Sequence, residues 1–430
     1  MVGALGNMDD GSNSLAHASI VLIWIISLAS ILCMLLRPRR IAEAYWVCGG
    51  GILLVLTRLI PLSQAALAVY DGLDVYLFLT GMMILAELAR EEGVFDWVAY
   101  VAAQHAGNSP ARLFVLIYLV GTLVTALLSN DATAVVLTPA VLAVVRRFKI
   151  DPKPYLLACA FVANAASFVF PISNPANLVI FHQHLPPLGI WLRIFLLPSS
   201  ASILLTFLCL RWVSRKKLRG EMRGEVMRIL LSTEGKLALV GLAIAAAALV
   251  SSSAMGLSLG APTCCSAVFA MAVVAWRDRS IPLKVAKGVS WSVLPLVAGL
   301  FVVVEALKNA GLLRLGLAGL QRLAESSTGV AKGTAALVVA LLSNGMNNLP
   351  VALMSRAAIR HVQETRVVAH AILIGVDLGP NLSVTGSLAT ILWLIALRRE
   401  KVEITAWEFF KIGIIAMPVA LIASLLVLWN

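Results

Sequence analysis

The sequence predicts an all-α polytopic membrane protein made of two inverted repeats, with about ten transmembrane helices, two re-entrant hairpins and two broken helices. Three observations carry this prediction: an apolar composition, polar interruptions in matched pairs, and a repeated spacing of motifs. Of 430 residues, 60% are hydrophobic and 13% are charged, with a mean hydropathy of +0.92. A soluble protein of this length would carry about 25% charged residues. The class is therefore an integral membrane protein of helices.

The formal net charge of +12 reflects Lys and Arg residues that stand beside apolar segments. This placement is typical of cytoplasmic loops that contact anionic lipid headgroups. We expect the lipid bilayer to be a partner and expect no nucleic-acid binding, because the modules that stack on bases or read grooves are absent. The six cysteines show no C-x-x-C spacing, which argues against a disulfide framework, and most of them are interpreted as small buried hydrophobic residues. The N-terminus lacks the basic region of a cleavable signal peptide.

The first part of the chain predicts three spans and one interfacial helix. The first span, 17–36, separates Asp9-Asp10 from a basic segment at 37–40, so its N-terminus is expected outside the cytoplasm. The next two spans are expected at about 44–62 and 73–90. Residues 93–107 are amphipathic and too short to cross, which favours a helix along the interface.

A re-entrant hairpin is predicted at about 111–148. Its arms have about 17 residues each, or roughly 25 Å at 1.5 Å per residue, which is short for a full crossing. Both ends of the hairpin are basic, so both are expected on the cytoplasmic side, with Ser129-Asn130-Asp131 as the tip at mid-membrane. Two full spans joined by an ordinary loop are the alternative.

A broken helix is predicted at about 154–182. Pro171 and Pro175 remove helical donors and free carbonyl groups at its centre. A span at about 188–213 completes the first repeat, 1–213. A basic cytoplasmic loop, 214–235, separates it from the second repeat.

The second repeat, 236–430, is predicted to contain spans at about 236–251 and 257–276, a hairpin at about 328–360 that Ser343-Asn344-Gly345 interrupts, and a broken helix at about 366–398. Glu87 lies 218 positions before Glu305 (305 − 87), and Ser129-Asn130 lies 214 before Ser343-Asn344 (343 − 129). Ala176-Asn177 lies 213 before Ala389-Thr390 (389 − 176). The order of these motifs, their spacing and the hydropathy of the segments around them agree between the two halves of the chain.

Each repeat is expected to cross the membrane five times, so the second must be inverted. Arg398 and Arg399 then return the second broken helix to the cytoplasm, which leaves the C-terminus outside like the N-terminus. Arg356 and Arg360 near the second hairpin would fall outside, against the positive-inside rule.

Polar side chains at the four interruptions form the candidate substrate site. In a bilayer, exposed polar groups and non-helical backbone are tolerated only where they are buried in protein or line a cavity. Amides and hydroxyls both donate and accept hydrogen bonds, and the set contains no Lys or Arg, so it suits a small hydroxyl-rich or carboxylate solute or a hydrated ion rather than a strong anion. The alternative is that these residues cap hairpin ends and bind helices together. The candidates are Ser129, Asn130, Thr133, Ser173, Asn174, Asn177, Asn344, Asn347, Asn348, Asn381, Ser383, Thr385, Ser387 and Thr390.

Two acids at the interruptions, Asp131 and Asp377, are the candidates for proton coupling. A carboxylate at mid-membrane could bind a proton in one state and release it in another. Glu87 and Glu305 match across the repeats and are weaker candidates, because each sits near a helix end followed by Gly and could equally be structural.

No phosphate-binding loop and no nucleophile–base constellation is present, so we expect a transporter without ATP hydrolysis and not an enzyme. We expect no cofactor and no fixed metal. His182-Gln183-His184 has no accompanying carboxylate or Cys and favours a solvated loop. The Cys264-Cys265 pair is remote in sequence from the polar breaks and is interpreted as structural.

The stretches LLSNDATAVVLTP, SNPANLVIF, LLSNGMNNLP and VDLGPNLSVTGSLATILW resemble the arsenical pump membrane protein family, the ArsB-type arsenite and antimonite permeases of the ion transporter superfamily. The resemblance covers nearly the whole chain. Dicarboxylate/sodium symporters and sodium/proton antiporters of the superfamily also carry paired Ser-Asn tips. Dicarboxylate carriers typically have Thr where this chain has Asp131 and Gly345, which favours the arsenical branch.

The resemblance implies export of trivalent arsenic or antimony, as the neutral trihydroxide, across the bacterial inner membrane in exchange for protons. It also implies that a soluble arsenite-stimulated ATPase could dock at the cytoplasmic face, for which Arg215-Lys216-Lys217 is a candidate surface, although lipid contact explains these residues as well. Two alternatives stay open: a sodium- or proton-coupled transporter of another solute, such as silicate, a dicarboxylate or sodium, and a channel or passive subunit.

Overall fold

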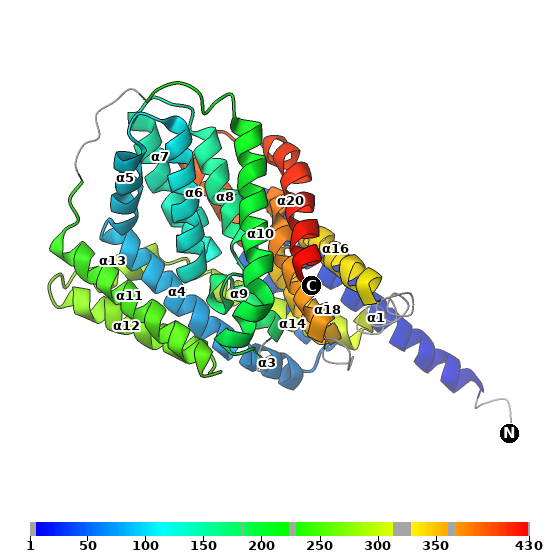
Figure 1. Cartoon of the computed structure of the whole chain (residues 1–430). Helices are drawn as coiled ribbons and strands as arrows, with labels where there is room; N and C mark the ends of the chain where they lie inside the picture. Colours follow the sequence, from blue (N-terminus) through cyan, green and yellow to red (C-terminus); the bar gives the residue numbers. More distant parts are fainter. Residues whose placement is uncertain (1–5, 182–184, 223–228, 313–327, 360–365, 429–430) are drawn as a thin grey trace.

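The computed structural model describes residues 6–181, 185–222, 229–312, 328–359 and 366–428, and these residues form helices and connecting segments without a strand (Figure 1). The expected loop at 182–184 and parts of the basic loop and of the second hairpin's end lie outside the described residues. The all-α prediction is confirmed. The helices separate into two groups by the way they pack against one another.

The first group, here called the framework, holds eight helices from both halves of the chain. In the first half α1 packs on α2, and α2 and α3 pack on α14; in the second half α11 packs on α12, and α12 and α13 pack on α4. Each half therefore completes the other. The framework helices are α1 (Gly6–Leu36), α2 (Glu43–Leu56), α3 (Leu62–Asp71), α4 (Leu73–Glu91), α11 (Thr233–Ala254), α12 (Gly260–Ala275), α13 (Ile281–Gly288) and α14 (Val293–Asn309).

The second group, here called the core group, contains the predicted hairpins and broken helices. Within it α6 packs on α8, α16 on α18, α9 on α17, and α10 on α20. In Figure 1, α6, α8, α10 and α20 stand side by side, while α4, α11 and α12 run obliquely beneath α5 and α6. The first-half elements are α5 (Val94–Ala106), α6 (Pro110–Leu127), the π-helix η2 (Ala132–Leu137), α7 (Thr138–Arg147), α8 (Lys153–Ala165), η3 (Pro171–Ser173), α9 (Pro175–Phe181) and α10 (Leu188–Ser214). The second-half elements are α16 (Thr328–Met346), α17 (Asn348–Ile359), α18 (Arg366–Leu378), η5 (Gly379–Asn381), η6 (Val384–Gly386), α19 (Leu388–Arg399) and α20 (Ala406–Leu428).

The repeat extends further along the chain than the sequence motifs indicated. α3 and α4 meet at a 47° bend, and α13 and α14, about one repeat later, meet at a 42° bend. The packing follows the same correspondence: α2 of the first half packs on α14 of the second, and α12 of the second half packs on α4 of the first. A two-fold relation between the halves would produce such reciprocal packing. The inverted orientation of the second repeat stays a prediction.

Helix length supports a polytopic membrane protein. Among the described residues, six helices are long and apolar enough to cross a membrane, and the two bent pairs bring the number to eight. α2 and α12 are apolar but shorter, with 14 and 16 residues. α6 and α16, the first arms of the expected hairpins, belong to the six, so the re-entrant course and the total of ten crossings stay predictions.

The second expected span, 44–62, is wrong at its C-terminal end. α2 ends at Leu56, and α3 starts as a separate helix at Leu62. Arg58 adopts a positive φ of 57°, which a continuing helix does not allow, and Pro61 precedes α3 in extended backbone. The residues from Leu62 onwards therefore form α3, which packs on α14 instead of continuing α2.

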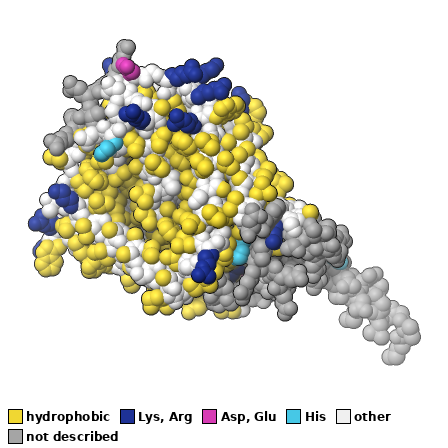
Figure 2. Space-filling model, in the orientation of Figure 1, with side chains coloured by type: hydrophobic (Ala, Val, Ile, Leu, Met, Phe, Trp, Pro, Cys, Tyr) yellow, Lys and Arg dark blue, Asp and Glu magenta, His cyan; other side chains and the backbone are white. Residues whose placement is uncertain are grey.

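The surface in Figure 2 is largely apolar, with a group of Lys and Arg side chains at its upper end. Ion pairs tie three connections at one end of the molecule: Arg146 to Glu400 at 3.0 Å, Lys153 to Glu408 at 2.6 Å and Lys217 to Asp151 at 2.8 Å. Segments that the charge pattern places on the cytoplasmic side thus share one end.

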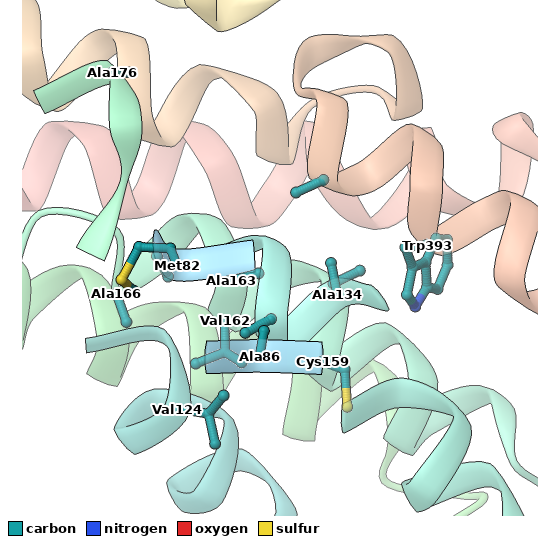
Figure 3. Packing of buried hydrophobic residues seen from close by; sticks show 14 of the residues in the cluster. Met82, Ala86, Val124, Ala134, Cys159, Val162, Ala163, Ala166, Ala176 and Trp393 are labelled. Carbon is teal, nitrogen blue, oxygen red and sulfur yellow. The ribbon is translucent and has the colours of Figure 1, made fainter. Parts of the chain in front are cut away.

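Small side chains let the core elements meet closely. Figure 3 shows Ala86 and Met82 of α4, Ala134 of η2, Ala163 of α8 and Ala166 just after α8 gathered in one buried cluster. Fully buried Trp393 of α19 donates its indole N–H to the Leu156 carbonyl of α8 at 3.2 Å, across the two repeats. The polar site is therefore enclosed by tightly packed apolar helices.

Gly413 lets α20 lie directly on the second break, because a Cβ at this position would overlap the Asn381 carbonyl oxygen. We predict that Gly413→Ala lowers the free energy of unfolding by about 1–3 kcal/mol, since the extra methyl must push helix or break aside. Thermal unfolding of the detergent-solubilised protein measures this. Gly329→Ala is the matched control, because nothing lies within 4 Å of its added Cβ. Equal stability of the two variants would contradict the prediction.

Candidate functional site

Two side-chain hydrogen bonds hold the first tip, Ser129 to Asp131, and the residues on either side of it. Ser129 Oγ accepts from the Ala132 N–H at 3.2 Å, and the hydroxyls of Thr125 and Thr133 lie 2.8 Å apart, joining α6 to η2. The six π-helical residues that follow were not predicted. A π-helix widens the turn and leaves backbone groups less regularly paired, and such segments are frequent at functional sites.

The first break is stabilised by its own side chains. Asn177 Nδ2 donates to the carbonyls of Ser167, Phe170 and Pro171, at 2.8, 3.4 and 3.4 Å. Ser173 Oγ donates to the Ala126 carbonyl at 3.0 Å, which ties the break to the first tip. These bonds replace helical hydrogen bonds that the break removes, so Ser173 and the Asn177 amino group have a structural task in this conformation.

The second break is bound to the second hairpin in the same way. Asn344 Nδ2 donates to the carbonyls of Ala340 and Gly379, at 2.7 and 2.9 Å. Ser383 donates to Asn344 Oδ1 at 2.7 Å, and Thr385 donates to the Asn344 carbonyl at 2.9 Å. Ser387 caps α19 by accepting from the Thr390 N–H at 3.1 Å.

The second tip lies later than the sequence indicated. α16 continues through Ser343-Asn344-Gly345 to Met346, and the chain turns at Asn347, whose φ is 74°. Asn tolerates this left-handed conformation, and its Oδ1 accepts from the Leu349 N–H at 3.3 Å. The expectation that Ser343 to Gly345 interrupts the helix is therefore wrong. Asn347 makes the turn, and buried Asn348 begins α17.

The two broken helices meet at a point that we call the crossing, made of Asn164, Asn174, Asp377, Asn381 and Thr390. Asn174 Nδ2 donates to Asp377 Oδ1 at 2.8 Å. Asn164 Nδ2 donates to Asn381 Oδ1 at 3.0 Å and reaches Thr390 Oγ1 at 3.5 Å. Asn381 Nδ2 donates to the Phe161 carbonyl at 3.1 Å. Each of these bonds joins one half of the chain to the other.

Asn164 was missed by the sequence reasoning. It lies in α8, before the break, in a stretch that reads as ordinary apolar helix. The repeat contains the signal that would have found it, because Asn164 lies 213 positions before Asp377 (377 − 164), the same separation as between Asn177 and Thr390. Asn164 and Asp377 thus occupy equivalent places in the two repeats.

Four buried acceptor atoms at the tip and the breaks have no hydrogen-bond partner among the described residues: Asn130 Oδ1, Asn164 Oδ1, Asn177 Oδ1 and Asp377 Oδ2. Ser167, which is close to Asp377, donates to the Asn164 carbonyl at 2.7 Å instead. Unpaired buried acceptors are uncommon in folded proteins. A ligand or water that donates hydrogen bonds would satisfy all four, and a proton would satisfy the Asp377 oxygen.

Asp131 points to a different place from Asp377. It lines a cavity of about 80 Å³ between the framework and the core group, together with Ser129, Glu87 and Ser290. Glu305 is elsewhere and partly exposed, with an ion pair to Lys308 at 3.0 Å. The structure therefore separates the four acids into one at the crossing, two at the cavity and one outside both.

The fold and this buried polar site define a multi-pass membrane transporter. The chain belongs to the citrate transporter (CitMHS) family, which matches residues 19–380. It is similar to the arsenical pump membrane protein of Escherichia coli, with 25% identity over 92% of this chain and 95% of that protein. The arsenical pump membrane protein of Yersinia enterocolitica is 28% identical over 79% of this chain and 82% of that one.

Two solved structures share the fold. The YdaH transporter of Alcanivorax borkumensis superposes with a TM-score of 0.58 at 14% identity, covering 85% of this chain and 86% of that one. MtrF of Neisseria gonorrhoeae, described with a class of antimetabolite efflux pumps, gives a TM-score of 0.51 at 13% identity, covering 88% and 83%. At these identities the likeness supports the fold alone.

We predict that Asn164→Ala lowers the free energy of unfolding by about 1–3 kcal/mol, because buried Asn381 Oδ1 then loses its donor. Thermal unfolding measures the effect. Ser200→Ala is the control, since the Ser200 hydroxyl bonds only to the Leu196 carbonyl of its own helix and is exposed. If Asn164→Ala is no less stable than Ser200→Ala, the bond across the crossing does not stabilise the fold.

Proposed function

We propose that this transporter exports trivalent arsenic or antimony, as the neutral trihydroxide, across the bacterial inner membrane in exchange for protons. The observation that carries the proposal is the crossing, where three amides, one hydroxyl and one carboxylate from the two halves meet in a fully buried place. The similarity to arsenical pump membrane proteins supports the same substrate class.

The hydrogen-bonding groups suit a neutral triol. A trihydroxide offers three O–H donors, and the crossing has two acceptor atoms in need of donors, Asn164 Oδ1 and Asp377 Oδ2; Asn130 Oδ1 at the first tip and Asn177 Oδ1 at the first break are two more. It also carries acceptor oxygens, which amide N–H and hydroxyl groups can bind. A neutral solute needs no buried countercharge, and the residues that make the crossing include no Lys or Arg.

Asp377 is the proposed proton-coupling group of the crossing. Its side chain is fully buried, and one carboxylate oxygen has no partner among the described residues. A single charge costs free energy in such a place, and a proton removes that cost. Proton binding would also weaken the bond that Asn174 donates to Asp377, because a hydrogen bond to a charged acceptor is the stronger one. Proton and substrate occupancy would thereby influence the same contact.

Transport requires the site to open to each side in turn. The packing into a framework and a core group suggests how this occurs: the core group, which holds both hairpins and both broken helices, moves against the framework. Asp131 at the cavity between the groups is the second proposed proton-coupling residue.

A soluble arsenite-stimulated ATPase is a possible partner in this proposal, with the segment after α10 as its docking surface. Arg215 stacks on Trp212 at 5.4 Å, and Lys217 pairs with Asp151 at the basic end of the molecule. A lipid headgroup would satisfy the same cations. If these cations bind the ATPase, the Arg215→Ala, Lys216→Ala double variant pulls down less of the purified ATPase than wild type does. If they contact lipid headgroups instead, the two proteins pull down equal amounts.

The second candidate function is sodium- or proton-coupled transport of another small solute, and the family match favours a carboxylate as that solute. Citrate carries several negative charges near neutral pH. A site without Lys or Arg would have to bind co-transported cations to hold it. Silicate transport and sodium/proton exchange are further members of this class, and a passive channel would differ from all of them by failing to accumulate a solute.

We predict that everted vesicles containing the wild-type protein accumulate arsenite under an imposed proton gradient without ATP, and that Asp377→Asn and Asp131→Asn each reduce this accumulation by about tenfold or more, because neither amide can carry a proton. Radioactive or mass-spectrometric arsenic uptake measures it. Asp278→Asn is the control, because Asp278 lies in the exposed α12–α13 connection.

Competition and ion replacement complete this experiment. Sodium-dependent uptake of citrate, with no arsenite uptake under any gradient, would overturn the arsenite proposal and favour the second candidate. Equal arsenite uptake with and without the gradient would indicate a channel.

A further inference from the structure

The cavity between the framework and the core group contains an acid that the crossing does not use. Glu87, in α4, is 7% exposed and lines this cavity of about 80 Å³ from the framework side. Asp131 and Ser129 line it from the first tip, and Pro175 and Leu392 line it from the two broken helices. Two carboxyl groups from elements of different groups thus border one small space.

The cavity is large enough and polar enough for water. A water molecule occupies about 30 Å³ in the liquid and is stable in a cavity when it has two to four polar partners. Glu87, Asp131, Ser129 and Ser290 supply such partners at the wall. Water here would connect the two carboxyl groups by hydrogen bonds.

Glu87 is held in place by its surroundings. Arg90 Nε donates to Glu87 Oε2 at 2.9 Å, and the other arm of the guanidinium donates to Oε1 at 2.5 Å. Gly288 of α13 packs against the carboxylate so closely that a Cβ there would overlap it. The absence of a side chain at Gly288 thus leaves the space that the Glu87 carboxyl group fills.

Arg90 does not depend on Glu87 alone. The same guanidinium donates to Glu91 at 2.5 Å, and the Arg90 side chain is about half exposed. When Glu87 takes a proton, Arg90 can keep Glu91 and solvent as partners, so no buried cation is left uncompensated. Asp96 of α5 is the next acid that interacts with Arg90. On α13, the cations are Lys284, which pairs with Asp278, and Lys287, while the cavity walls from α9, α14 and α19 carry no charge.

The repeat provides a direct comparison. Glu305 is the equivalent of Glu87 and has the equivalent base, Lys308, three residues later. Its side chain is 28% exposed, and it does not line the cavity with Asp131. Only the Glu87 copy therefore shares a cavity with a tip acid, which distinguishes it from an ion pair that merely ends a helix.

We propose that Glu87 is a proton-relay residue: it passes protons, through water in the cavity, between Asp131 and solvent at the Arg90 end of α4. During export one proton moves from the Asp131 carboxyl group to the Glu87 carboxylate and from there to solvent, which leaves Glu87 ionised and paired again with Arg90. Because the two acids belong to different helix groups, movement of the core group would make and break this path. The inference rests on the proposed function only in taking Asp131 as a coupling acid.

The test runs this reversible path in the opposite direction and measures protonation of Asp131 without any metalloid. After a light-triggered release of protons from a caged compound, time-resolved infrared spectroscopy of the nanodisc-reconstituted protein follows the Asp131 carboxyl band, which Asp131→Asn assigns by its loss. We expect Glu87→Gln to slow the appearance of this band by about tenfold or more. Glu305→Gln is the matched control and is expected to leave the rate unchanged.

A second variant tests whether the position of the Glu87 carboxyl group matters when the group itself is kept. Gly288→Ala keeps the Glu87 carboxyl group but displaces it from the cavity, and it is expected to slow the same band, while a circular dichroism melt confirms that the helices are intact. An unchanged rate in Glu87→Gln, or an equal slowing in Glu305→Gln, would overturn the relay. This experiment measures no solute transport, so its result can be interpreted even if the vesicles take up no arsenite. Likewise, a negative result for the relay does not change the interpretation of the uptake experiment.

Discussion

Broken helices inside a membrane leave backbone groups without partners, and the rest of this structure depends on how they are satisfied. Water is absent from the bilayer core, so protein atoms must supply the hydrogen bonds. Asn177 serves three carbonyls of the first break, and Asn344 serves two carbonyls at the second. The side chains that make the breaks possible are therefore amides, and one of them, Asn177, also brings an unpaired acceptor atom into the interior.

The repeat turns these local solutions into a site. Each break is tied to its own hairpin, through Ser173 and the Ala126 carbonyl in the first half and through Ser383 and Asn344 in the second. The two units then meet through Asn174 with Asp377 and Asn164 with Asn381. Equivalent positions carry different chemistry, since Asn164 corresponds to Asp377. One half of the crossing thus has a group that can carry a proton, and the other has a neutral amide of nearly the same shape.

A comparable difference separates Glu87 from Glu305. Both acids end a helix beside a base three residues later, as the repeat requires. Gly288 and the first tip enclose Glu87, whereas Glu305 is partly exposed. The sequence repeat therefore identifies which residues are equivalent, but it does not identify which of two equivalent residues lies in a functional environment. In a transporter with two similar halves, function is expected where the environments of equivalent residues differ.

The sequence by itself determined the membrane class, the order of the helices, the two breaks and most polar residues near them, because apolar length and proline placement act locally. It misplaced the second tip, since Asn347 rather than Ser343 to Gly345 makes the turn, and it ended the second span too late. Only the tertiary structure decided that Asn164 joins the crossing, that Asp131 and Asp377 lie in different places, and that Glu87 borders a cavity. These facts depend on contacts between segments about 200 residues apart, which no local pattern contains.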